Sequence, residues 1–137
     1  MAASYRERRG TGPDFRVRYS FLSEAEGGRK ELPFQHIRSD FLYEGDDPHK
    51  DGIWCIWPEF LSTSGEALPE DNRRVPAEGL ADMYVLNADL RDEHVKRIRV
   101  GTQGYLVEGP KKTAVCEVVA VLGLCDAELK PCGQADA

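Results

Sequence analysis

The alternating stretch that begins at Phe15 constrains the fold of this chain more than any other. Large apolar side chains occupy every second position from Phe15 to Phe21, and Arg16, Arg18 and Ser20 stand between them. A period of two places one set of side chains in a core and the other toward solvent, as in a half-buried β-strand. The pair Gly27-Gly28 follows, and glycine permits the positive φ that a sharp turn requires. The chain is therefore expected to open with a strand and a tight turn.

Five further apolar or alternating runs predict strands, at about residues 39–44, 52–60, 80–86, 105–107 and 113–122. Asn87 can cap a short helical turn over residues 89–96, where acidic residues come first and basic ones last. The connections are of the hairpin type, without the alternation of strands and helices that a parallel sheet needs. The predicted fold is therefore all-β: a closed six-stranded antiparallel β-barrel with one short helical turn.

Length and composition predict one globular domain. The chain has 137 residues, of which 41% are hydrophobic and 31% charged, as is typical of a soluble domain. Residues 1–14 are expected to form a disordered arm, residues 15–124 the barrel and residues 125–137 a loose tail. No run is apolar enough to span a bilayer, and the first residues lack the apolar segment of a secretory signal. A cytoplasmic location, with no membrane contact, is expected.

Short motifs at both ends of the predicted barrel resemble the third, C-terminal β-barrel domain of elongation factor Tu. The first motifs are Leu22-Ser23, Glu26-Gly27-Gly28-Arg29, Pro33-Phe34 and Arg38-Ser39-Asp40-Phe41, in this order. The last is the segment GYLVEGPKKTAV, from Gly104 to Val115, which is similar to that domain's closing hairpin. The resemblance covers about residues 15–124 and implies a stand-alone domain of this type.

The resemblance also implies roles for the two turns. In elongation factor Tu the first turn lies on the side that docks on the GTP-binding domain, which makes Gly27, Gly28 and Arg29 a candidate docking turn. The closing turn contacts tRNA there, and it corresponds here to a candidate RNA-contact turn of Glu108, Gly109, Lys111 and Lys112. Pro110 departs from the family pattern and removes a backbone N–H that could bind a phosphate.

A non-enzymatic binding module with an unknown protein partner is the favoured hypothesis. The formal net charge of −6 disfavours non-specific binding to nucleic acid, which rests on a basic surface. Trp54 and Trp57 lie in the most apolar segment, and tryptophan is enriched at protein interfaces, so they form a candidate apolar interface. In the alternative interpretation, one tryptophan fills the barrel and the other packs under a loop.

Binding of RNA or tRNA is the second hypothesis. It would use Lys96, Arg97 and Arg99 together with Lys111 and Lys112. Contacts from these side chains to phosphates would make the affinity fall steeply as salt rises.

A small-ligand or enzyme domain is the third hypothesis, with a cleft near the acidic loop at residues 44–52. Asp46, Asp47, His49 and Asp51 of this loop are possible metal ligands, but the loop lacks the twelve-residue calcium pattern, so no metal is expected. The chain has no phosphate-binding loop of the G-x-x-x-x-G-K-[ST] type, so neither a nucleotide nor GTPase activity is expected.

Histidines and cysteines supply no catalytic residue and no cofactor site in this interpretation. His36, His49 and His94 are far apart in the sequence and are expected at the surface. Cys55 and Cys116 lie in apolar runs and are expected as buried thiols. Cys125 and Cys132 stand in the polar tail, and the lack of a C-x-x-C pair makes a zinc site unexpected.

Overall fold

The computed structural model of the chain describes residues 12–47, 49–50, 52–69, 71, 73–86, 91–109 and 111–123. Six β-strands, one 3₁₀ turn and one α-helix occur within these residues. Their bounds are β1 Phe15–Phe21, η1 Glu24–Glu26, β2 Asp40–Tyr43, β3 Ile56–Phe60, β4 Glu78–Val85, α2 Arg91–Arg97, β5 Gln103–Glu108 and β6 Lys111–Val121. The prediction of six strands and one short helix is confirmed.

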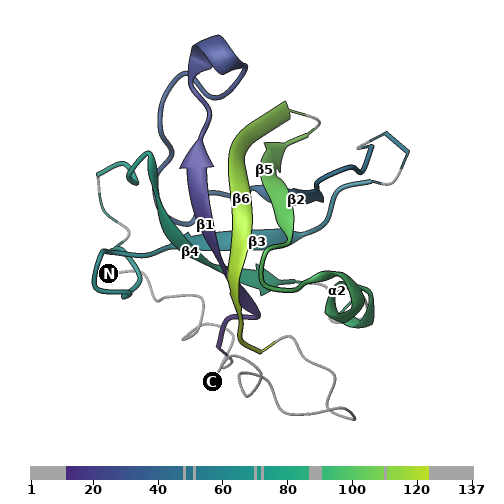
Figure 1. Cartoon of the computed structure of the whole chain (residues 1–137). Helices are drawn as coiled ribbons and strands as arrows, with labels where there is room; N and C mark the ends of the chain where they lie inside the picture. The colour runs from purple at the N-terminus through teal and green to yellow at the C-terminus, as the bar shows by residue number, and fades with distance from the viewer. Residues whose placement is uncertain are drawn as a thin grey trace.

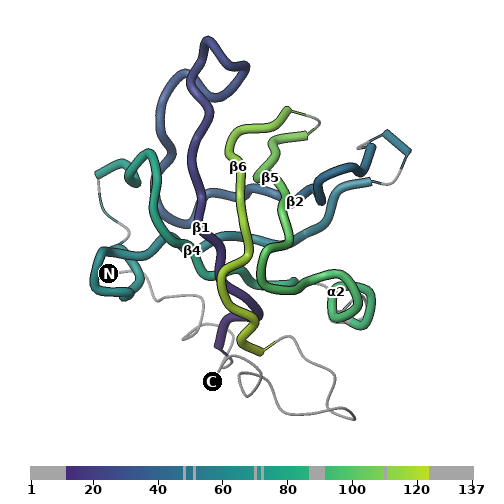
Figure 2. Tube along the Cα trace, in the orientation of Figure 1, coloured from purple at the N-terminus to yellow at the C-terminus, as the bar shows by residue number. Residues whose placement is uncertain are grey.

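All six strands belong to one antiparallel sheet in the order β2-β5-β6-β1-β4-β3. The sheet is strongly curled, so that β3 crosses behind β1 and β6 (Figure 1). Its inner face holds the core, and Phe15, Val17 and Tyr19 of β1 are fully buried there, as the alternation predicts. The tube view shows the turn after β1 and the β5–β6 turn at the same end of the sheet (Figure 2).

The predicted closed barrel is wrong in one respect, because the sheet does not close fully. Phe41 of β2 and Trp54 form an isolated bridge through two hydrogen bonds of 2.9 Å. If the antiparallel pairing continued in this register, Gln35, six residues before Phe41, would stand opposite Phe60, six residues after Trp54. There the Gln35 side chain, not its backbone, accepts from the Phe60 N–H at 2.8 Å and donates to the Phe60 carbonyl at 2.8 Å.

Proline at position 58 gives a physical reason for this interrupted seam between β2 and β3. The N–H of Phe60 faces the seam, and alternation along β3 turns Pro58 to the same side. Proline has no N–H to donate, so β3 cannot continue the ladder past this residue. The Gln35 amide replaces the missing backbone partner at Phe60 and protects the strand edge.

A close approach inside the core depends on Gly104 of β5. A Cβ atom at this position would lie 2.3 Å from Cζ of Phe41 and 2.8 Å from the Leu42 carbonyl oxygen. Glycine therefore allows the Phe41 ring to pack against the backbone of β5. Phe41 is fully buried and makes edge contacts with Phe15 and Tyr43.

The sheet's hydrogen bonding begins before the predicted boundary at residue 15. The Asp14 N–H donates to Met83 O at 2.9 Å, and the Asp14 carboxylate accepts from the Val85 N–H at 2.7 Å. The Gly123 N–H donates to Pro13 O at 3.0 Å, so both ends of the described chain meet. Asn87 and the predicted tail at residues 125–137 lie outside the described residues.

Two short helical elements flank the sheet. η1 begins with a capping box, in which Ser23 and Glu26 each accept a hydrogen bond from the other's backbone N–H. α2 lies at the side of the sheet near β5 (Figure 1) and has acidic residues in its first turn and basic residues in its last. No helix among the described residues is long and apolar enough to cross a membrane.

Candidate functional site

A groove of about 800 Å³ lies on the side of the sheet opposite the core, over β1, β4, β5 and β6. Strand register arranges its outward side chains in two rows. The first row runs Leu80–Arg18–Glu117–Gln103 and the second runs Glu78–Ser20–Val115–Tyr105. We call this surface the outer groove.

The floor of the outer groove is small and apolar at its centre. Val115 is 40% exposed, which makes it one of the exposed large apolar side chains of the described chain. Ser20 lies beside it on β1, and a serine between larger neighbours leaves the second row hollow. Leu80 on β4 is half-buried and adds a further apolar side chain.

The outer groove carries more negative than positive side chains. The carboxylates Glu44, Glu78 and Glu117 line it together with a single arginine, Arg18, so its formal charge is 1 − 3 = −2. Arg18 lies 3.9 Å from Glu117, and both side chains are well exposed. Glu44 accepts a hydrogen bond from the Tyr105 hydroxyl, which raises the pKa of Tyr105. Among the described residues, no hydrogen bond or ion pair involves the Glu78 carboxylate, which is exposed.

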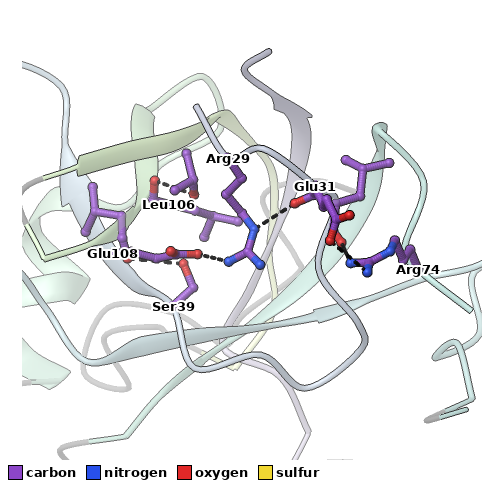
Figure 3. Close-up of polar contacts among 9 residues, drawn as sticks. Arg29, Glu31, Ser39, Arg74, Leu106 and Glu108 are labelled. Carbon is purple, nitrogen blue, oxygen red and sulfur yellow. Dashed lines mark hydrogen bonds and ion pairs between the residues drawn. The ribbon is translucent and has the colours of Figure 1, made fainter. Parts of the chain in front are cut away.

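The structure brings the two predicted turns together. The Arg29 guanidinium of the candidate docking turn forms an ion pair with the Glu108 carboxylate of the candidate RNA-contact turn. Figure 3 shows Arg29 between Glu108 and the Glu31 backbone, to which it donates a second hydrogen bond of 2.9 Å. Arg74 binds the Glu31 carboxylate at 3.0 Å and extends the chain of contacts. The two turns therefore form one surface.

The backbone of the candidate docking turn requires glycine at both Gly27 and Gly28. Gly27 has a φ of +93° and closes η1 with its N–H bound to Glu24 O at 3.0 Å. A Cβ at Gly28 would lie 2.2 Å from the Leu22 carbonyl oxygen, so only glycine fits without movement. These contacts shape the turn and present Arg29 toward Glu108.

The candidate RNA-contact turn carries two exposed lysines, Lys111 and Lys112, at the start of β6. The Lys112 ammonium lies 4.2 Å from the centre of the Tyr105 ring, a cation–π contact. Gly109 is exposed with a φ of +62°, and Pro110 lies outside the described residues.

One of the other basic residues of the RNA hypothesis, Arg97, is already paired with a carboxylate. Arg97 makes a two-bond ion pair with Asp46 at 2.9 and 3.0 Å, and its guanidinium lies 3.7 Å from the Tyr43 ring centre. Lys96 and Arg99 are exposed near the end of α2. Asp46 of the predicted acidic loop thus serves as the partner of Arg97.

Trp54 and Trp57, the two residues of the candidate apolar interface, lie in different environments. Trp54 is half-buried and packs on the core, with ring contacts to Tyr43 and His94. Its indole N–H is buried without a hydrogen-bond partner among the described residues. Trp57 is half-buried on the outer side of β3, where Arg38 lies 5.6 Å from its ring.

Two of the three histidines and one cysteine differ from expectation. His94 is buried and hydrogen-bonds the Tyr43 hydroxyl at 2.6 Å, because α2 folds over the end of the sheet. The His36 side chain is 6% exposed and contacts Glu59, whereas His49 is exposed as predicted. Cys55 is exposed because it comes before β3 begins, whereas Cys116 is buried as predicted. Cys125 and Cys132 lie outside the described residues.

A row of four ionisable side chains crosses β1, β4 and β3 and was missed by the sequence analysis. Arg16 binds Asp82 at 2.6 Å, Asp82 stands opposite Glu59, and Glu59 contacts His36 at 2.6 Å. Arg16 supplies a positive charge at one end of the row, and the His36 ring forms a hydrogen bond with Glu59 at the other. Glu59 and Asp82 are buried on the outer side of the sheet. No group of three or more potential metal ligands occurs among the described residues.

No model of a known protein family matches this chain, and no curated protein matches it at a significant level.

Proposed function

We propose that this chain is a non-enzymatic protein-docking module similar to the third domain of elongation factor Tu. The single observation that carries the proposal is the outer groove, an open hollow over four strands with Val115 exposed at its centre. Exposed apolar side chains in a hollow, with polar groups around them, are typical of protein-binding surfaces.

The distribution of charge supports a protein over RNA as the partner. Arg29 of the candidate docking turn and Arg97 of α2 are each bound by a carboxylate. A phosphate that approached either one would compete with Glu108 or Asp46 and meet their negative charge. The outer groove itself carries more glutamates than arginines, which also repels phosphate.

The histidine environments support a binding role over catalysis. His94 is fully buried against Tyr43, and His36 is buried against Glu59. Burial raises the pKa of Tyr43, so its hydroxyl stays protonated and serves as a hydrogen-bond partner at neutral pH. A general acid or base must reach its substrate, and these side chains are packed inside the fold.

A pull-down from a native lysate tests the proposal, with RNA and protein scored at about 50 and 200 mM salt. The matched variants are Val115→Asp in the outer groove and Val100→Asp, at a valine that is 58% exposed outside it. A protein retained at both salt concentrations and lost only with Val115→Asp supports docking. RNA that is retained at low salt and lost at high salt, without a protein partner, overturns the proposal and favours RNA binding.

A further inference from the structure

We propose that the outer groove binds an extended segment of a protein partner that carries an apolar side chain two residues from a lysine or arginine. This inference rests on the proposed docking function and specifies its partner. It depends on two separate positions in the groove, one apolar and one acidic.

The apolar position lies at the centre of the second row. Val115 is 40% exposed, and Ser20 pairs with it across the β1–β6 ladder. Tyr105 stands on the other side of Val115, on β5, so a side chain placed over Val115 would contact an aromatic ring as well. Burial of an apolar side chain there favours binding, because apolar surface of both partners is removed from water.

The acidic position lies at the Glu78 end of the same row. Glu78 pairs with Ser20 across the β1–β4 ladder, so its carboxylate is two strands from Val115. Neighbouring strands are about 4.8 Å apart, which puts the two positions about 10 Å apart. Side chains at positions i and i+2 of an extended segment lie on the same face about 7 Å apart, and a long lysine or arginine side chain spans the remaining distance.

Glu78 differs from the other two carboxylates of the groove in having no partner among the described residues. Glu117 faces Arg18, and Glu44 accepts from Tyr105. The ammonium of Lys112 lies beside Tyr105, so the Glu44 end already has a cation nearby. An incoming lysine or arginine is therefore attracted to the Glu78 end, and this also sets the direction of the segment.

Charge disfavours the other occupants of the groove. A second copy of this chain has a net charge of −6 and would bring more negative charge to an acidic surface. Nucleic acid would place phosphates against Glu78 and Glu117. A basic segment gains from the same field through faster association and better selectivity.

Photo-crosslinking from Val115 identifies the segment directly. The photoreactive amino acid p-benzoylphenylalanine replaces Val115 in one protein and Val100 in the control, and the tagged proteins are irradiated in native lysate. We expect a partner crosslinked from position 115 and not from position 100. The crosslinked partner peptide, read by mass spectrometry, should contain a lysine or arginine within two residues of an apolar one.

The Glu78 contact is then measured with a synthetic peptide of the crosslinked sequence. Glu78→Gln should weaken peptide binding about three- to fivefold, as expected for an exposed ion pair. Glu66→Gln, a control at an exposed glutamate outside the groove, should leave the binding unchanged.

Three results would overturn the inference. They are an acidic crosslinked peptide, equal effects of the two glutamate variants, and a partner that is retained in the pull-down but does not crosslink from position 115. In the last case the docking function stands and only the assignment of the groove fails. If the pull-down retains no protein, the docking function itself fails and the inference fails with it.

Discussion

The Arg29 guanidinium and the Glu108 carboxylate form an ion pair that joins the turn after β1 to the end of β5. The residues are far apart in the sequence, and their side chains are 27% and 35% exposed. The contact links the candidate docking turn to the candidate RNA-contact turn, so a change in one turn is expected to affect the other.

A double-mutant cycle measures this link. Arg29→Gln and Glu108→Gln should show a coupling free energy of about 0.5–1 kcal/mol in urea unfolding, because the pair is partly exposed. The coupling should fall as salt rises. Arg73 and Asp71 are bound to each other within one exposed loop and provide the control, with a smaller coupling expected. Full additivity of the Arg29 and Glu108 variants would contradict the prediction.

The Gln35 side chain is expected to be essential for the stability of the seam. Gln35→Ala leaves the buried Phe60 N–H without its partner, whereas the Phe60 carbonyl still accepts from the Leu68 N–H at 2.9 Å. A buried group left without a partner costs about 1–3 kcal/mol, so the free energy of unfolding should fall by about that amount. Gln103→Ala changes an exposed glutamine and should cost less than about 0.5 kcal/mol. Equal unfolding midpoints for the two variants would contradict this account of the seam.

Gly104→Ala is expected to strain the core. The added methyl group would clash with the Phe41 ring and the Leu42 carbonyl, and overpacking of this kind costs about 1–3 kcal/mol. Gly79→Ala on β4 is the control, because its nearest contact would be an ordinary 3.4 Å to the Tyr19 hydroxyl. Thermal unfolding of both variants tests the prediction, which fails if Gly79→Ala is the more destabilised.

Local patterns were enough to predict the six strands. Alternation from Phe15 to Phe21 predicted β1 and its buried side, since a period of two is a property of the strand itself. The capping box of Ser23 and Glu26 has a local signature as well, its S-x-x-E spacing, which specifies a helical turn where the glycine pair alone predicts only a tight turn. Pro58 inside a strand signals an edge, and it could have predicted the incomplete closure.

The candidate site could not be predicted in the same way, because it depends on register. The outer groove exists because Ser20 pairs with both Glu78 and Val115, and no local pattern specifies those pairs. Glu59 is buried because His36, from a distant loop, covers it. Apolar neighbours suggested that Cys55 was buried, but the strand begins one residue later and leaves the thiol exposed.

The two described cysteines are expected to react very differently. Cys116 is buried, and burial raises the pKa of its thiol to about 12, so the reactive thiolate is scarce at pH 8. Cys55 is exposed. Iodoacetamide at pH 8, followed by peptide mapping, should label Cys55 in the folded protein and Cys116 only after unfolding in urea. Similar labelling of both in the folded protein would contradict the structure.

Stability is expected to fall at alkaline pH. Burial raises the pKa values of Cys116 and Tyr19 to about 12, above those of the unfolded chain, which are about 8.5 and 10. Their stabilising contribution is therefore complete below about pH 8 and is lost progressively as pH rises toward 12, since the unfolded chain then releases protons that the folded chain retains. Cys116 alone should account for a loss of about 1–2 kcal/mol between pH 8 and pH 10. Urea unfolding at both pH values measures this loss of stability. Cys116→Ala should reduce the loss. Cys55→Ala is the control at an exposed thiol and should leave the loss unchanged. An equal loss in wild type and Cys116→Ala would show that the Cys116 thiol does not control the alkaline transition.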